Sequence, residues 1–433
     1  MVNITLSPSS SASPLLPKPY KRATKALTRS FGAAIKAAKP ADFSSYAKTA
    51  SGLTGASLKA YEQSLRRRYA LRDVAARLMP DERVARCGHH LAPMAGGKLA
   101  AGVRVQYSPS NQSSHYEGLE ACSSVWMCSC CAAKITERRR VEIARAMREA
   151  KRLGLKVVMC TYTFSHHRWD KLEDILKALQ KAWSRYTGGR RADRLNTVFQ
   201  PIGFIKALEV TYGDINGWHP HLHVLYFLPA NTNVKSFGSA ARTIWMEAAY
   251  SAGLTVGDDY GFKMDTADHK VAWYIAKFGK EPTKATQDAW DQGWNESNEL
   301  AKWHTKMGRA RHVTPMQLLA DYAATGDAWL GKLWQEYAGV FKNKRQLFWT
   351  PGLKKFFGIE EKTDKELAEE KMADANTLVF LYLEEWLAIV RYHKQVDLLM
   401  VARRSKGDAT AVADYLYGLG FHRFAPGGTG RRV

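Results

Sequence analysis

Three alternating histidines stand out in the segment GWHPHLHVLYFL, residues 217–228. The flanking residues are apolar, which predicts a buried β-strand, and alternate side chains of a strand lie on one face. His219, His221 and His223 therefore share a face. Neutral imidazole binds divalent ions, and two histidines at i and i+2 converge on one ion. The alternative is that these histidines only form hydrogen bonds within the core. We interpret the strand as part of a metal site.

A carboxylate on the preceding segment would complete such a site. Phe204–Thr211 also predicts a strand, and the turn Tyr212–Trp218 contains glycine, aspartate and asparagine, as β-hairpin turns do. Pairing of the two strands brings Glu209 opposite the histidine strand, which makes it the predicted third ligand. The alternative is that Glu209 is an exposed charge at an edge position.

Four cysteines suggest a second metal site. Cys128-x-x-Cys131 has the spacing of a zinc knuckle, and two further cysteines complete four thiolates. His89 and His90 are the spare candidates. The predicted ligands of a structural Zn²⁺ are Cys87, Cys122, Cys128 and Cys131.

The segment Val271–Glu281 predicts a helix with another reactive group. At about 100° per residue, Tyr274 and Lys277 lie on the same helix face. A tyrosine phenolate can attack phosphate and remain covalently attached to it, and a nearby cation offsets the high reference pKa of the phenol. The alternative is an ordinary amphipathic pair.

The elements that must position these residues predict an α+β fold with a central, mainly antiparallel sheet flanked by helices. The remaining strand is Lys156–Phe164. The predicted helices are Tyr61–Leu78, Lys134–Leu153, Trp169–Tyr186, Val234–Gly253, Asp265–Lys280 and Asn376–Val401.

Charge indicates the partner. The 433 residues contain 64 Lys and Arg against 41 Asp and Glu, a net charge of +23 and a pI near 9.7, which favours attraction to nucleic acid. No run of about 18 apolar residues is present, so no membrane span is predicted.

Composition and pattern divide the chain into five predicted parts. They are a basic, poorly ordered arm at 1–55; a basic helix, a zinc-binding module and a helix at 56–153; an α+β domain with the histidine strand at 154–310, which the resemblance given next implies to be a nuclease domain; a helical C-terminal region at 311–405; and a tail at 406–433.

The order of three motifs carries a resemblance. VVMCTYTFSHH, HPHLHVL and WYIAK follow one another at 157–167, 219–225 and 273–277. This order resembles the HUH endonucleases, and more closely the single-tyrosine initiators of rolling-circle plasmid replication. The resemblance covers roughly Cys87 to Leu353.

The resemblance implies roles for individual residues. His221 and His223 would bind Mg²⁺ or Mn²⁺ with Glu209. Tyr274, assisted by Lys277, would cut one DNA strand at the replication origin, at a single-stranded or hairpin nick site, and keep its 5′ phosphate. Either His166 or His167 would touch DNA, or the two form a plain surface pair. Host helicase and polymerase are further implied partners, and the implied location is the cytoplasm of a bacterium, with the gene on a plasmid.

One departure and two rivals accompany this resemblance. Related initiators often carry a glutamate one helical turn before the tyrosine, where this sequence has Lys270. How a replication round would end is therefore open. The alternatives are a single-tyrosine HUH transposase and a non-catalytic, zinc-containing DNA-binding regulator.

Overall fold

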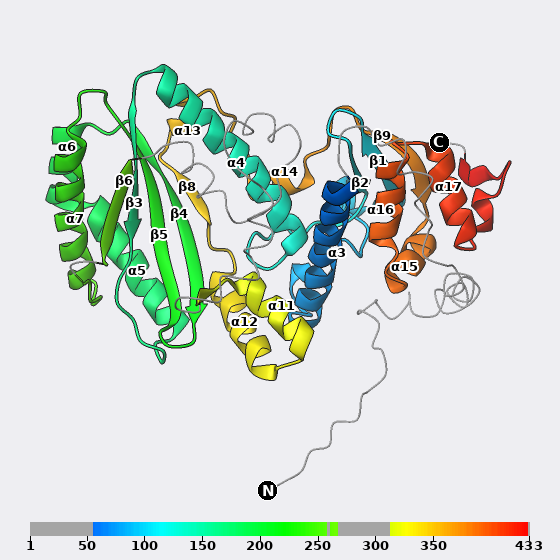
Figure 1. The fold of residues 1–433 in the computed structure, drawn as a ribbon, viewed down its shortest axis with the longest axis horizontal. Helices are drawn as coiled ribbons and strands as arrows, with labels where there is room; N and C mark the ends of the chain where they lie inside the picture. The colour runs from blue at the N-terminus through cyan, green and yellow to red at the C-terminus, as the bar shows by residue number, and fades with distance from the viewer. Residues whose placement is uncertain (1–54, 258–259, 267–311, 432–433) are drawn as a thin grey trace, which may run out of the picture. The chain divides into compact units, whose positions relative to one another are not determined.

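The computed structural model describes residues 55–257, 260–266 and 312–431. The chain forms two compact units, one from the residues up to Cys122 together with Glu369–Val433, the other from Ser123–Ala368. Both combine an antiparallel sheet with flanking helices, which confirms the predicted α+β class (Figure 1). Among the described residues, no helix combines the length and the apolar character needed to cross a bilayer.

The first unit contains a three-stranded sheet in the order β2-β1-β9. Its strands are β1 (Val103–Ser108), β2 (Ser113–Glu117) and β9 (Asn376–Leu381), and its helices are α3 (Gly55–Leu78), α15 (Leu383–Arg391), α16 (Gln395–Arg404) and α17 (Ala409–Gly418). Four short 3-10 turns complete it: η1 (Arg83–Ala85), η2 (Ala95–Gly97), η3 (His422–Phe424) and η4 (Thr429–Arg431).

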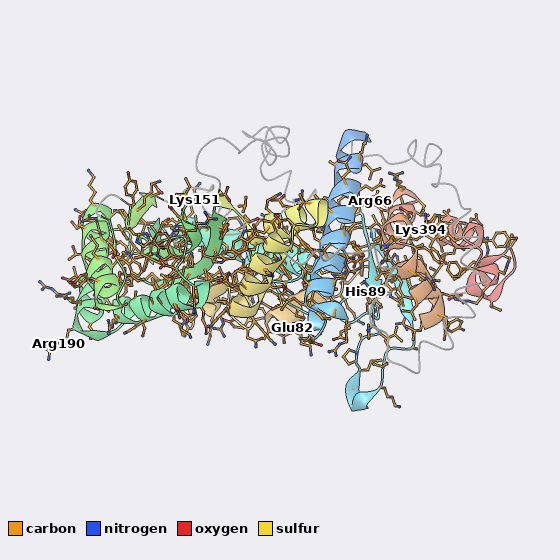
Figure 2. The ribbon with its side chains drawn as sticks, turned by 90° about the horizontal axis from the view of Figure 1, so that it is seen from below. Arg66, Glu82, His89, Lys151, Arg190 and Lys394 are labelled. Atoms are coloured by element: carbon orange, nitrogen blue, oxygen red, sulfur yellow. The ribbon has the colours of Figure 1, made fainter. Side chains whose placement is uncertain are left out.

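Helices cover one face of this small sheet. Val103 and Val105 of β1 pack with Trp386 of α15 and Leu416 of α17 in one buried cluster. Ion pairs join helices α3 and α16 at its edge. Arg66 of α3 and Lys394 both form ion pairs with Asp397 of α16, and the two basic residues are labelled in Figure 2.

The second unit is built on a six-stranded antiparallel sheet. The order is β6-β3-β5-β4-β7, and β8 also pairs with β4. The strands are β3 (Lys156–Tyr162), β4 (Gly203–Gly213), β5 (Gly217–Leu228), β6 (Phe262–Thr266), β7 (His312–Val313) and β8 (Leu347–Trp349). The helices are α4 (Ser129–Arg152), α5 (Leu172–Thr187), α6 (Gly189–Phe199), α7 (Val234–Ser251), α11 (Pro315–Thr325), α12 (Ala328–Phe341), α13 (Leu353–Phe356) and α14 (Asp364–Glu369).

One face of this sheet is covered by α5 and α7 (Figure 1). Tyr162 of β3 packs its ring against Trp183 of α5 and Trp245 of α7. Its hydroxyl lies 2.8 Å from the hydroxyl of Tyr186 and 3.0 Å from that of Tyr226. The buried tyrosines thus satisfy one another's polar groups, as a dry layer requires.

On the opposite face, the described residues place helix α4 over one end of the sheet. Ile143 and Ala146 of α4 pack against Leu225 and Phe227, which lie at the C-terminal end of β5. The histidines lie nearer the start of the same strand. The end of β5 that carries Leu225 and Phe227 therefore belongs to the core, and the histidines continue the same face of the strand.

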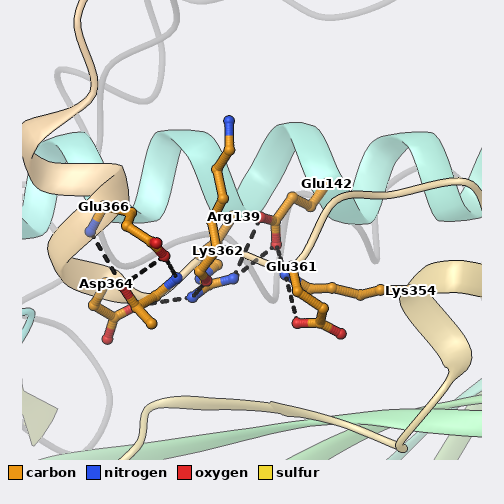
Figure 3. A network of polar contacts seen from close by, with 8 residues as sticks. Arg139, Glu142, Lys354, Glu361, Lys362, Asp364 and Glu366 are labelled. Atoms are coloured by element: carbon orange, nitrogen blue, oxygen red, sulfur yellow. Dashed lines mark hydrogen bonds and ion pairs between the residues drawn. The ribbon is translucent and has the colours of Figure 1, made fainter.

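A network of charged side chains holds α4 against this end of the sheet (Figure 3). Lys354 of α13, which is 1% exposed, lies 3.0 Å from Glu142 of α4. Glu142 also accepts a hydrogen bond from Arg139, whose guanidinium donates a second hydrogen bond to Asp364. Pairing is what makes a buried ammonium tolerable, so this network joins α4 to the segment that follows β8.

The structure corrects three sequence-based predictions. The predicted helix Asn376–Val401 is strand β9 followed by α15 and α16, because the apolar run Leu378–Leu381 pairs with β1. The start of the predicted helix Asp265–Lys280 is the end of strand β6; the rest lies outside the described residues. The expected tail at 406–433 contains α17, whose Leu416 is core.

Candidate metal centre

Strand pairing brings the predicted ligands together. In the β4–β5 ladder Glu209 pairs with His221, and Ala207 pairs with His223. Directly paired residues of an antiparallel ladder share a face, and so do residues two apart on one strand. Glu209, His221 and His223 therefore project from the same side of the sheet, as the alternation in the sequence predicts.

The three side chains converge on one point. Oε2 of Glu209 lies 3.4 Å from Nε2 of His221 and 3.5 Å from Nε2 of His223. The three possible ligand atoms all lie within 4.8 Å of one another. The His223 side chain is 3% exposed and the other two are largely buried. This group could bind a metal ion.

The other ring nitrogen of each histidine is held by protein oxygen. Nδ1 of His221 donates to the carbonyl of His219 at 3.1 Å, and Nδ1 of His223 lies 3.0 Å from the hydroxyl of Thr161. A carbonyl only accepts, so the proton of a neutral His221 is on Nδ1 and the lone pair is on Nε2. Such outer contacts are the usual way in which a ligating imidazole is oriented.

The carboxylate is ionised at neutral pH. Burial alone would raise the pKa of Glu209, but its interactions with His221 and His223 outweigh this effect and lower the pKa to about 2. An ionised carboxylate beside two imidazoles is the donor set that a divalent cation needs.

His219 belongs to a different network. Its Nε2 lies 3.1 Å from the hydroxyl of Thr163, and its Nδ1 lies 2.5 Å from Nε2 of His166. Nδ1 of His166 donates to the carbonyl of Asn216 at 2.7 Å. Both ring nitrogens of His219 thus contact residues other than Glu209, although the ring lies on the same face of β5 as His221 and His223. The sequence pattern alone gives no sign of this difference.

The cysteines form a second group. The sulfur atoms of the four predicted ligands, Cys87, Cys122, Cys128 and Cys131, all lie within 4.8 Å of one another, and all four residues are buried. Cys128 is the N-cap of α4, and its sulfur accepts a hydrogen bond from the backbone N–H of Cys131. The group could bind metal. His89, a spare candidate, lies 3.1 Å from Asp73 instead.

The remaining two cysteines lie outside this group. Cys130 is half-buried, and Cys160 is buried within β3. Burial raises the pKa of the Cys160 thiol to about 12, so that it stays protonated at neutral pH.

The predicted nucleophile cannot be placed against the metal group. Tyr274 and Lys277, together with the neighbouring Lys270, lie outside the described residues. Strand β6, which precedes them in the sequence, is described and pairs with β3.

Comparison with known proteins identifies relatives of this chain. A family model described as "Replication protein" matches residues 117–241, which include β3, β4 and β5. "Protein rep" of Streptomyces lividans is 28% identical over 367 residues, covering 68% of this chain and 78% of that protein. "Neomycin resistance protein" of Streptomyces cyanogenus is 29% identical over 139 residues, covering 27% of this chain and 32% of that protein. No solved structure matches. Residues 117–241 of this chain are therefore similar to the replication-protein family, and the chain over most of its length is similar to a Rep protein.

Proposed function

We propose that this protein initiates rolling-circle replication of a plasmid by nicking and rejoining one DNA strand at the origin. The family match and the relative named "Protein rep" support the replication role. The observation that carries the nuclease chemistry is the convergence of Glu209, His221 and His223 on one point.

The donor set favours a particular class of ion. Two imidazole nitrogens and one carboxylate oxygen suit divalent ions that accept both nitrogen and oxygen. Of the two ions implied by the resemblance, Mn²⁺ suits this set better than Mg²⁺, which prefers oxygen ligands and retains several waters. When bound, the ion would act as a Lewis acid on the scissile phosphate.

The chain's own groups would hold the ion and perform the cut. Glu209 would offset part of the ion's charge, and the two histidines would supply its nitrogen ligands. In the proposed step the phenolate oxygen of Tyr274 attacks phosphorus and the bond to the 3′ oxygen breaks. The leaving 3′ oxygen takes a proton, and the 5′ phosphate stays on the tyrosine. Lys277 would supply positive charge for the phenolate. The reverse transfer rejoins the strand.

The rest of the chain supports DNA binding in this proposal. A net charge of +23 attracts the phosphate backbone without regard to sequence. The four-cysteine group would hold a structural Zn²⁺, because four thiolates at this spacing are a usual zinc ligand set. Host helicase and polymerase are proposed partners of the replication step.

The test is to trap the covalent intermediate. The purified full chain is incubated with Mn²⁺ and 3′-labelled single-stranded oligonucleotides that tile the DNA around its gene. The labelled band is then mapped by mass spectrometry. We expect a DNA–protein adduct at Tyr274 that disappears in Tyr274→Phe and in Glu209→Gln. Tyr260→Phe, at a tyrosine that is 83% exposed, is the matched control and should form the adduct normally.

Two results would contradict the proposal. An adduct that persists in Tyr274→Phe shows that another residue is the nucleophile. Absence of any adduct or nick with the unmodified chain, while DNA binding is retained, favours the non-catalytic regulator.

A further inference from the structure

The loop between β3 and α5 presents an aromatic pair to solvent. Trp169 is 80% exposed, and its ring stacks on the ring of His167 with 5.4 Å between centroids and 11° between planes. Among the described tryptophans only Trp329 is also exposed, at 54%; the others are buried. An exposed indole stacked on a second flat ring offers an aromatic face on which a ligand can stack.

The loop is held in place by several contacts. His166 donates to the carbonyl of Asn216 at the tip of the β4–β5 hairpin. Asp170 accepts a hydrogen bond from the backbone N–H of His167 at 2.7 Å and returns one to its carbonyl at 3.1 Å. At the start of the loop, Ser165 donates its N–H to the carbonyl of Thr255. The aromatic pair therefore stands on an ordered backbone, which lowers the entropy cost of binding.

The same contacts connect the loop to the metal group. The rings of His166 and His219 lie 4.7 Å apart, and those of His219 and His221 lie 5.0 Å apart, centroid to centroid. His221 is one of the three residues that converge on Glu209. The exposed pair thus lies on a loop whose His166 contacts the strand that carries two of the candidate ligands.

The surroundings fit a nucleic-acid strand better than a protein partner. Arg168 and Lys171, which flank the exposed indole, are both exposed cations. Ile215 at the hairpin tip, 80% exposed, adds apolar surface beside Asn216. Aromatic faces beside cations are how proteins hold unpaired bases and the phosphates between them.

We propose that His167 and Trp169 form a base-stacking platform for single-stranded DNA next to the cleavage site. In this arrangement Trp169 stacks on an unpaired base, and Arg168 and Lys171 face the phosphates. His166 is a positioning residue that ties the platform to β5 and does not itself contact DNA. The inference rests on the proposed function, since it assigns a site to the DNA that the metal centre would cut.

The test measures binding without cleavage. A fluorescently labelled oligothymidine is titrated with the full chain in EDTA, and the Kd is read from anisotropy. Trp169→Ala removes one stacking aromatic residue and is expected to raise the Kd by about 5- to 150-fold. Trp169→Phe keeps a flat ring and should restore most of the affinity. Trp329→Ala, the matched control on α12, should bind as the unmodified chain does.

The outcomes separate this inference from the proposed nicking activity. If Trp169→Ala binds oligothymidine with unchanged Kd, the platform does not exist, whether or not the chain nicks DNA. If binding falls but the unmodified chain forms no covalent adduct, the platform stands and the nicking proposal fails. An equal loss of affinity for a fully paired duplex also overturns the inference, because bases within a duplex are not available for stacking.

Discussion

The hydroxyl of Thr161 lies 3.0 Å from Nδ1 of His223, the most buried histidine of the candidate metal centre. Thr161 and His223 are direct partners in the β3–β5 ladder, and the next strand out places Lys263 opposite Thr161. Strand pairing therefore fixes the position of the Thr161 hydroxyl relative to the His223 ring. If Nε2 of His223 binds metal, the proton of the ring is on Nδ1 and is donated to Thr161.

Thr161→Val should therefore weaken metal binding without harming the fold. Valine has nearly the shape of threonine and suits a central strand, but it cannot accept the histidine proton. Loss of such an outer contact typically reduces metal affinity by about 10- to 100-fold. We expect this loss for Mn²⁺ in isothermal titration calorimetry, with Thr161→Ser close to the unmodified chain. Equal affinities for all three proteins would show that Thr161 does not orient His223.

Removing Glu142 should destabilise the second unit. Without it, the described partners of the buried Lys354 ammonium are the exposed Glu361, 3.7 Å away, and the ring of Trp349. Leaving a buried charge without its close partner costs about 3–5 kcal/mol. Glu142→Leu should therefore lower the free energy of unfolding by about this amount in urea titrations. The double variant Glu142→Leu/Lys354→Met should recover most of the loss; if it does not, the cost comes from packing and not from charge.

Lys206 is a partly buried cation that should cost stability at neutral pH. Burial, together with the positive charge of Arg345, lowers its pKa from 10.5 to about 8. Between these two values the unfolded chain binds more protons than the folded chain, so the stability of the unmodified protein rises with pH across this window.

Replacement of Lys206 by methionine should consequently stabilise the fold below pH 8. A tenfold change in proton affinity corresponds to about 1.4 kcal/mol. Methionine would also lose the contacts of the ammonium with the rings of Trp183 and Phe348. Each contact stabilises the folded chain by about 0.5–2 kcal/mol, which reduces the net gain in stability. We expect a net gain of ~1 kcal/mol at pH 7 that vanishes near pH 10.5, measured by urea unfolding at both pH values. A gain that is independent of pH would refute the charge explanation.

Gly217 should tolerate no side chain. Its φ is +73°, and an added Cβ would lie 2.9 Å from the carbonyl oxygen of Arg168. Gly326, at the end of α11, has a similar φ of +69° with nothing within 4 Å of an added Cβ. The left-handed conformation costs a residue other than glycine roughly 1–2 kcal/mol.

The comparison of the two glycines isolates the contact. Gly326→Ala should lose only the stability that the left-handed conformation costs an alanine. Gly217→Ala should lose more, because the hairpin tip must also move away from the loop that carries Trp169. Thermal melts of both variants measure this difference, and equal losses would show that the loop yields without cost.

The sequence by itself determined the core of the candidate site. Alternation along a strand places His221 and His223 on one face, and a short hairpin turn sets the register that brings Glu209 opposite them. Both are local rules, in which every partner lies within about twenty residues. The helix α4 and the strands β3, β4 and β5 could be predicted for the same reason.

Only the tertiary structure shows what engages His219, the histidine that the resemblance leaves out of the ligand set. His219 has the same residue type and the same face as its neighbours, but His166, more than fifty residues earlier in the chain, engages it. Likewise β9 looks helical in isolation and becomes a strand because β1 offers an open edge, more than 250 residues away in sequence. Contacts between such distant segments depend on packing of the whole unit, which a local pattern does not contain.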